Sequence, residues 1–140
     1  MCGGYNALKD IYKLDVFKLC HWRNEKHPAG GLGPQGQIMP VNIIEKPPTA
    51  ELRADQKDED SLPPYEVLDD ILECLIEGEM RAKDIIARGH QPETVARISH
   101  LLYIAEYKRR QAPPGVKISD KNFGRDRRYP ITNGYRDKTL

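Results

Sequence analysis

Hydrophobic residues recur at helical spacing along most of the chain, which is the pattern of helices that each bury one apolar face. The first predicted helix covers residues 6–24, with Asn6 as its N-cap because an asparagine side chain can accept a free amide of the first turn. The next begins after Pro63 and Pro64 and ends at Gly78, since glycine commonly closes helices. Its apolar face consists of Tyr65, Leu68, Ile71, Leu72, Leu75 and Ile76.

Two further helices are predicted, a short one over residues 81–88 that closes at Gly89 and a last one over residues 91–111. In the last helix the apolar positions are Val95, Ile98, Leu102 and Ala105. A double proline follows it, so its final turn holds three consecutive cations, Lys108, Arg109 and Arg110. Cations there complement the negative end of the helix dipole, each worth roughly 0.3–1 kcal/mol, and this alone explains them without a ligand.

The segments between the helices have the composition of loops. Glycines and prolines interrupt residues 25–42, and the apolar burst at residues 41–44 predicts a short strand. Residues 45–79 carry twelve acidic and three basic side chains. The acidic run at residues 55–60 lacks the spacing of a calcium-binding loop, so we expect a mobile, solvated loop there and assign no metal site.

Charge is divided unevenly along the chain. Its 140 residues, with a mean hydropathy of −0.68, suit one domain with a modest core. The net charge is only +1, yet residues 106–140 carry ten Lys/Arg against four Asp/Glu, and residues 1–105 carry twelve against seventeen. A basic tail beside an acidic body suggests an anionic ligand, a nucleic acid or attraction between the two halves, whereas the simplest interpretation is a solvated tail.

The residues after Gly115 alternate arginines with aromatic residues and proline, which predicts an extended arm able to lie on another surface. Cys2, Cys20 and Cys74 fit no zinc spacing and are expected to be free thiols in the cytoplasm. No apolar run approaches the ~20 residues that cross a bilayer, so we expect no membrane partner.

The two helices joined at Gly89 permit a second interpretation, a helix-turn-helix whose basic tail contacts nucleic-acid phosphates. Glu93, near the start of the second helix, would face the DNA backbone, and the acidic residues 45–79 would be repelled. These charges argue against a nucleic-acid partner. A protein-interaction module with a basic tail is a third possibility.

Long motifs carry a more specific signal. They are GGYNALKDIYK at residues 3–13, KPPTAELRADQKDEDSLPPY at residues 46–65 and EYKRRQAPPG at residues 106–115, followed by FGRD at residues 123–126 and RYPIT at residues 128–132. Through these motifs almost the whole chain resembles the C-terminal end of bacterial glutamine-dependent NAD⁺ synthetases. Strings of this length do not recur by chance, unlike an isolated glycine motif.

The resemblance implies an activity and a set of site residues. In that family, ATP adenylates the carboxylate of deamido-NAD⁺ and pyrophosphate leaves, and ammonia derived from glutamine then displaces AMP. The resemblance implies that Lys13 and Thr49 contact ATP, and that Tyr107 and Lys108 contact deamido-NAD⁺. Mg²⁺ is implied with ATP, and no catalytic residue is assigned within this chain.

The family's Ser-Gly-Gly-x-Asp-Ser pyrophosphate-binding loop and its glutaminase domain do not occur in this sequence. We therefore expect an incomplete fragment, inactive alone, whose partner is a separate N-terminal half or another copy of the full-length enzyme. As a fold we expect a mainly α chain, the C-terminal part of an α/β adenine-nucleotide alpha-hydrolase-like (Rossmann-like, PP-loop) domain. Residues 1–111 would belong to the synthetase domain and residues 112–140 to a basic arm.

Overall fold

The computed structural model describes residues 3–46, 62–122 and 125–134, and these residues form two compact units. The first unit combines Met1–Ile11 with Glu66–Leu140, and the second consists of Tyr12–Tyr65. The described residues form helices and loops with no β-strand longer than a single bridge, so the expectation of a mainly helical chain is confirmed. None of the helices within them is long and apolar enough to span a membrane.

The second unit contains α1 (Lys13–Glu25) and α2 (Val41–Glu45), connected by the loop at residues 26–40. The side chain of Asn24, near the end of α1, organises this loop. Its Oδ1 accepts the backbone N–H groups of Ile38 and Met39, both at 2.9 Å, and its Nδ2 donates to the carbonyl of Met39 at 2.8 Å. The loop predicted from glycine and proline content is confirmed. The loop has no regular backbone hydrogen bonds at Ile38 and Met39, and the Asn24 side chain provides partners for these backbone groups instead.

Two predictions in this region are wrong. The first helix begins at Lys13, seven residues later than predicted, and the backbone N–H of Asn6 donates to the carbonyl of Pro114 at 2.8 Å. A long-range partner therefore takes the place of a helical turn at Asn6. The predicted strand at residues 41–44 is the helix α2, which starts directly after Pro40. Isolated apolar runs of this length do not distinguish strand from helix, and no second strand is available among the described residues to pair with it.

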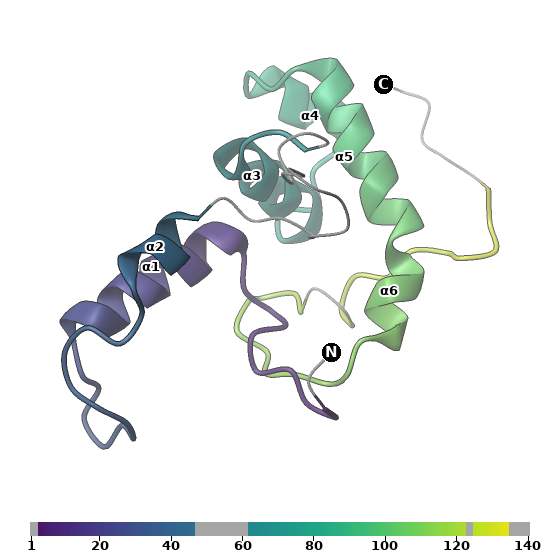
Figure 1. The fold of residues 1–140 in the computed structure, drawn as a ribbon. Coiled ribbons are helices and arrows are strands. Elements are labelled where there is room, and N and C mark those ends of the chain that lie inside the picture. Colours follow the sequence, from purple (N-terminus) through teal and green to yellow (C-terminus); the bar gives the residue numbers. More distant parts are fainter. Residues whose placement is uncertain (1–2, 47–61, 123–124, 135–140) are drawn as a thin grey trace, which may run out of the picture. The chain divides into compact units, whose positions relative to one another are not determined.

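The first unit contains α3 (Tyr65–Ile76), α4 (Ala82–Ala87), α5 (Pro92–Ile104) and α6 (Glu106–Gln111), as Figure 1 shows. The first residue of α3, Tyr65, is counted with the second unit. The core of the first unit is built from the apolar faces that the periodicity predicts. The buried members are Ile71, Cys74, Leu75, Ile76, Ile85, Val95, Ile98, Leu102 and Tyr129. Complete burial of one aliphatic side chain is worth about 1.5–3 kcal/mol, so each of the fully buried aliphatic residues stabilises the unit substantially.

The ends of the helices follow the sequence with one exception. Gly89 takes the left-handed conformation, with φ +109°, after α4 as predicted. After α3, however, the left-handed residue is Glu79, with φ +49°, and Gly78 is not left-handed. A Cβ at Gly78 would lie 3.0 Å from the carbonyl oxygen of Cys74, so glycine is needed there for space instead.

The predicted helix over residues 91–111 forms as two helices in line (Figure 1). Only Ala105, with φ −82° and ψ 1°, separates α5 from α6. Its N–H still donates to Leu101 at 3.0 Å, and its carbonyl accepts from Lys108 at 3.0 Å. The hydrogen-bonded path is thus nearly continuous, and the three cations lie in the last turn of α6 as predicted.

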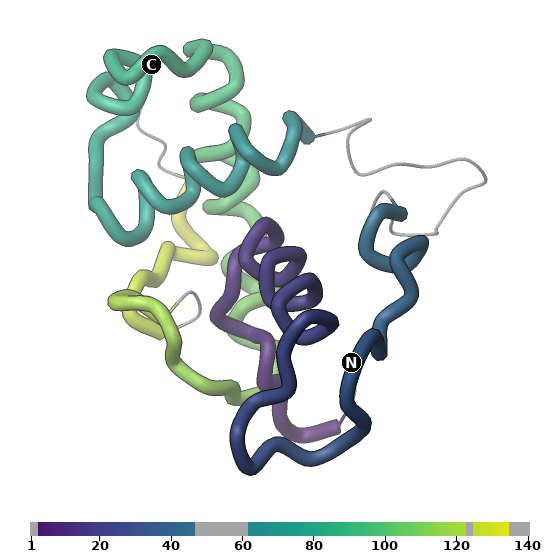
Figure 2. The backbone as a smooth tube through the Cα atoms, turned by 90° about the vertical axis from the view of Figure 1, so that its left-hand side faces the viewer, coloured from purple at the N-terminus to yellow at the C-terminus, as the bar shows by residue number. Residues whose placement is uncertain are grey.

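The N-terminal segment pairs with the chain that follows α6, and Figure 2 shows the two running side by side. Asn6 and Gly115 form a parallel bridge. Asp10, which is only 5% exposed, accepts the N–H groups of Ile118 and Ser119 at 2.7 and 2.9 Å, and the Ser119 hydroxyl at 2.8 Å. This buried carboxylate joins segments more than a hundred residues apart in the sequence.

The described part of the arm folds back onto its own unit, so the surface that Tyr129 lies on belongs to the same chain. This ring is buried against Tyr103, with centroids 4.3 Å apart. Lys121 and Arg127 both pair with Glu79, at 2.8 and 3.3 Å. At these positions, basic side chains of the arm therefore pair with an acidic side chain from the body of the chain. Cys20 and Cys74 are free thiols as expected, and Cys2 lies outside the described residues.

Candidate functional site

The last turn of α6 is organised by Glu106, whose side chain is 1% exposed. Its Oε2 accepts from Arg109 Nη2 at 2.9 Å, from Arg109 Nε at 3.3 Å and from the Tyr129 backbone N–H at 3.2 Å. Its Oε1 accepts from Arg110 Nε at 3.2 Å. Because residues three and four positions apart share one helix face, Glu106 can engage both arginines at once.

Burial raises the pKa of Glu106, but the hydrogen bonds from Arg109, the Tyr129 backbone and Arg110 outweigh burial and hold the pKa below its usual value. The carboxylate is therefore ionised at neutral pH, and the pair it forms with Arg109 is an internal ion pair. Removing one partner of such a pair strongly destabilises the folded protein, since the remaining charge stays buried without compensation.

Arg109 is held on several sides. Its side chain is 9% exposed, its Nη2 donates to the carbonyl of Leu102 at 2.7 Å, and its guanidinium lies 5.6 Å from the centre of the Tyr129 ring. The contact with Leu102 shows that a cation does satisfy a helix carbonyl here. Arg109 and Glu106 together attach α6 to the arm.

Tyr107 and Lys108 are exposed, in contrast to their neighbours. The Tyr107 side chain is 46% exposed, and the Lys108 Nζ lies 6.0 Å from the centre of its ring. Within the described part of the chain, no carboxylate pairs with the Lys108 ammonium. The structure thus places these two predicted ligand contacts side by side, with a cation and an aromatic ring available to solvent.

The other two predicted contacts lie elsewhere. Lys13 is the first residue of α1, in the second unit, and its Nζ lies 6.0 Å from the centre of the Tyr65 ring. Phe17 packs edge-on against the same ring, with centroids 6.4 Å apart. Lys13 therefore stands beside a small aromatic cluster of its own unit. Thr49 and the acidic run at residues 55–60 lie outside the described residues.

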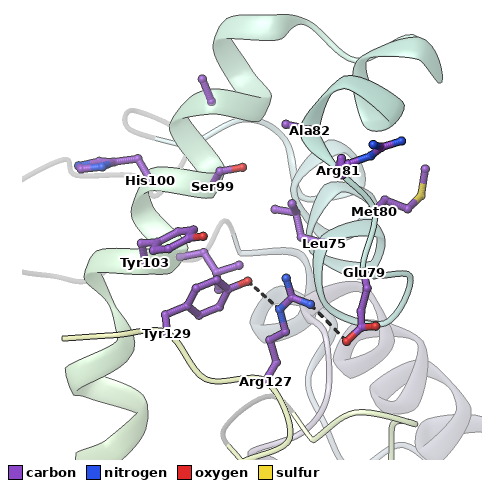
Figure 3. A pocket seen from close by; sticks show the side chains of 12 residues that line it. Leu75, Glu79, Met80, Arg81, Ala82, Ser99, His100, Tyr103, Arg127 and Tyr129 are labelled. Atoms are coloured by element: carbon purple, nitrogen blue, oxygen red, sulfur yellow. Dashed lines mark hydrogen bonds and ion pairs between the residues drawn. The ribbon is translucent and has the colours of Figure 1, made fainter. Parts of the chain in front are cut away.

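A pocket of about 300 Å³ opens in the first unit, and Tyr129 is one of its lining residues (Figure 3). Arg127 connects its walls, because Nε donates to the Tyr129 hydroxyl at 3.2 Å and Nη1 to Glu79 at 3.3 Å. The remaining lining residues are Leu75, Met80, Arg81, Ala82, Ala96, Ser99, His100, Leu102 and Tyr103. Sequence reasoning missed this pocket, although the alternation of arginine and aromatic residues in the arm marked two of its residues.

No group of three or more His, Cys, Asp or Glu side chains in residues 3–46, 62–122 and 125–134 could hold a metal ion.

Comparison with known proteins gives one consistent result. A family model described as NAD synthase matches residues 1–112. The glutamine-dependent NAD(+) synthetase of Rhodobacter capsulatus is 55% identical over 139 residues, which are 99% of this chain and 25% of that protein. The synthetase of Xanthomonas campestris is 50% identical, over 96% of this chain and 23% of that protein.

A solved structure agrees with these relatives. The glutamine-dependent NAD⁺ synthetase from Acinetobacter baumannii, in complex with adenosine diphosphate, is similar over 90% of this chain and 20% of its own, with a TM-score of 0.50 and 37% identity. This chain thus spans about a quarter of the length of the curated relatives that it matches.

Proposed function

This chain belongs to the NAD synthase family, and we propose that it takes part in the ATP-dependent amidation of deamido-NAD⁺ to NAD⁺. The match of the family model to residues 1–112 is the observation that carries the proposal. In this reaction the deamido-NAD⁺ carboxylate attacks the α-phosphorus of ATP and pyrophosphate leaves. Ammonia released from glutamine then attacks the acyl carbon, and AMP leaves as NAD⁺ forms. No observation favours the nucleic-acid-binding or protein-interaction alternatives.

The exposed pair Tyr107–Lys108 is the proposed contact for deamido-NAD⁺. The substrate carries phosphates and planar rings, and an ammonium beside an aromatic face offers a partner for each. A lysine ammonium is a compact point charge that binds phosphate oxygens well. The absence of a carboxylate partner at Lys108, within the described residues, supports this role because its charge is not already neutralised.

Lys13 and Thr49 are the proposed contacts for ATP. Lys13 supplies a cation that would stabilise negative charge on the phosphates, and its Nζ lies 6.0 Å from the centre of the Tyr65 ring. Mg²⁺ would accompany ATP, held by the phosphates and waters together with one or two protein oxygens. We place the reaction in the cytoplasm, where ATP is supplied, and propose that the remaining parts of the active site come from a separate N-terminal half or from another copy.

The assignment of Lys108 is tested by measuring the affinity of the chain for deamido-NAD⁺ with isothermal titration calorimetry. Lys108→Gln should weaken binding about tenfold or more, because a hydrogen bond to a charged group is worth about 1.5–3 kcal/mol. Lys83→Gln is the matched control, since Lys83 is an exposed lysine on α4 of the same unit. Equal losses for both variants, or no binding by the unmodified chain, would contradict the assignment.

A further inference from the structure

The pocket that Tyr129 lines takes no part in the proposed reaction. None of the four predicted ligand contacts lines it, and all of its lining residues belong to the first unit. We propose that this pocket is a second ligand site, which binds a small carboxylate with an aromatic body. The carboxylate lies on Arg127, and a polar group at the opposite end of the ligand bonds to Ser99. The site is independent of the proposed deamido-NAD⁺ contacts, Tyr107 and Lys108.

The size and the walls of the pocket favour a small ligand that is mostly apolar. Its volume of about 300 Å³ is at the lower end of the range for ligand sites, which is about 300–1,000 Å³. Figure 3 shows the rings of Tyr103 and Tyr129 on one side of it and Leu75 and Met80 on the other. Such walls remove apolar surface from water and offer stacking or edge contacts to a ring, whereas a hydrated inorganic ion gains nothing from them.

The charges around the pocket favour an anion. Its lining contains two arginines and one glutamate, Arg81, Arg127 and Glu79. Arg81 pairs with Asp84 at 3.0 Å, and Glu79 is shared between Arg127 and Lys121. Among these five side chains one positive charge is therefore in excess, and a carboxylate would neutralise it.

Arg127 has donors left for a carboxylate. Its Nε donates to the Tyr129 hydroxyl and its Nη1 to Glu79, which uses two of the five N–H groups of a guanidinium. The others have no hydrogen-bond partner among the described residues. Paired N–H groups of a guanidinium match the two oxygens of a carboxylate. The existing bonds also hold the Arg127 side chain in place, so little conformational freedom is lost when a ligand binds.

The hydroxyl of Ser99 marks the other end of the site. Its Oγ is buried and has no hydrogen-bond partner among the described residues. Figure 3 shows Ser99 on α5, away from Arg127, with its hydroxyl pointing into the pocket. Most buried polar side-chain atoms are hydrogen-bonded, because an unpaired one has lost its bonds to water without replacement. A ligand that carries a hydroxyl opposite its carboxylate would supply the missing partner.

The experiment is an NMR titration of the 140-residue chain with para-hydroxybenzoate, which combines a carboxylate, a ring and an opposite hydroxyl. The amides of Ser99 and Tyr129 should shift saturably, with a dissociation constant of about 1 mM or lower. Para-hydroxybenzamide, the neutral counterpart, should bind at least about fivefold more weakly. Inorganic phosphate should cause no saturable shift at these amides. The absence of saturable shifts with para-hydroxybenzoate, equal affinity for the amide, or saturable shifts with phosphate would overturn the proposal.

The Arg127 contact is tested by Arg127→Gln, which should weaken binding of para-hydroxybenzoate about tenfold and remove its advantage over the amide. A merely loosened arm would weaken both compounds alike. Arg128→Gln is the matched control, because Arg128 is an exposed arginine of the same arm that does not line the pocket. Its effect should stay within about twofold, and equal losses for the two variants would contradict the contact.

The Ser99 contact is tested by Ser99→Ala, which should weaken binding of para-hydroxybenzoate about threefold or more. Benzoate, which lacks the hydroxyl, should change less than about twofold in this variant. A loss of benzoate as large as that of para-hydroxybenzoate would contradict the contact.

Lys108→Gln separates this site from the proposed substrate contact. It should change binding of para-hydroxybenzoate less than about twofold, because Lys108 does not line the pocket. A loss as large as with Arg127→Gln would show that the compound binds at Lys108 and would overturn the second site. Failure of the chain to bind deamido-NAD⁺ would contradict the substrate contact and leave this site standing.

Discussion

At the scale of single residues, Gly115 is the most constrained position among the described glycines. A Cβ built there overlaps the backbone carbonyl oxygen of Asn6 and lies 2.7 Å from the Cβ of Lys9. Neither obstacle is the flexible end of a side chain, so neither can move aside cheaply. The absence of a side chain thus lets the N-terminal segment lie directly against the chain that follows α6.

We predict that Gly115→Ala lowers the free energy of unfolding by about 1–3 kcal/mol, the usual cost of overpacking. The matched control is Gly134→Ala, because a Cβ at Gly134 meets nothing within 4 Å, and its effect should stay within about 0.5 kcal/mol. Urea denaturation measures both. Hydrogen exchange at the Asn6 and Ile118 amides should become faster only in Gly115→Ala. Equal stability of Gly115→Ala and Gly134→Ala would contradict the close approach of Gly115 to the backbone of Asn6.

At the scale of elements, α6 and the arm are coupled through one carboxylate. The pKa of Glu106 is held below its ordinary value of 4.5, since the donors around the folded carboxylate outweigh the opposing effect of burial. A carboxyl group whose pKa is lowered in the folded state contributes its full stabilisation when the pH is above its ordinary, unfolded-state pKa. That contribution is lost as pH falls through the lower pKa of the folded state, because protonation then opposes folding.

Docking of the arm should therefore weaken in acid. We predict that the protection of the Tyr129 amide against hydrogen exchange, measured by NMR, decreases as pH falls from about 6 to about 3. Glu106→Gln should show weak protection throughout and no such decrease. Glu77→Gln, which keeps the Glu106 carboxylate, should retain the decrease. Protection in the unmodified chain that does not change with pH would argue against Glu106 as the coupling group.

At the scale of the whole molecule, the chain is a quarter of the length of its curated relatives, and its sequence contains no Ser-Gly-Gly-x-Asp-Ser loop. The described residues include an exposed cation beside an aromatic ring, Lys108 and Tyr107, which is the pair proposed to contact deamido-NAD⁺. Binding of deamido-NAD⁺ and formation of NAD⁺ are therefore separate questions for this chain.

We predict that the 140-residue chain alone forms no NAD⁺ from ATP, deamido-NAD⁺ and ammonia, even where calorimetry shows that it binds deamido-NAD⁺. The physical reason is that this sequence lacks the Ser-Gly-Gly-x-Asp-Ser loop, whose backbone amides would bind the pyrophosphate that must leave. The measurement is chromatographic detection of NAD⁺, with a full-length synthetase as the positive control. Clear turnover by the chain alone would contradict the prediction.

Most of what was predictable concerns local order. Periodicity located the helices and the core of the first unit, and glycine with proline located the loop at residues 26–40. Prediction from local patterns failed at Asn6 and at residues 41–44, where short patterns were compatible with more than one structure. The motifs identified the family, whereas the roles of Lys13, Thr49, Tyr107 and Lys108 stay predictions.

The sequence by itself determined the helices of the first unit, the uneven charge and the family, because these depend on spacing and on strings of neighbouring residues. Only the tertiary structure decided what the three cations of α6 face. Arg109 turns inward because Glu106 and Tyr129 are both within reach, and Tyr129 comes from an arm twenty residues further along the chain. Contacts between such distant segments leave no periodic trace in a sequence, so burial of Arg109 and exposure of Lys108 became visible only in the folded chain.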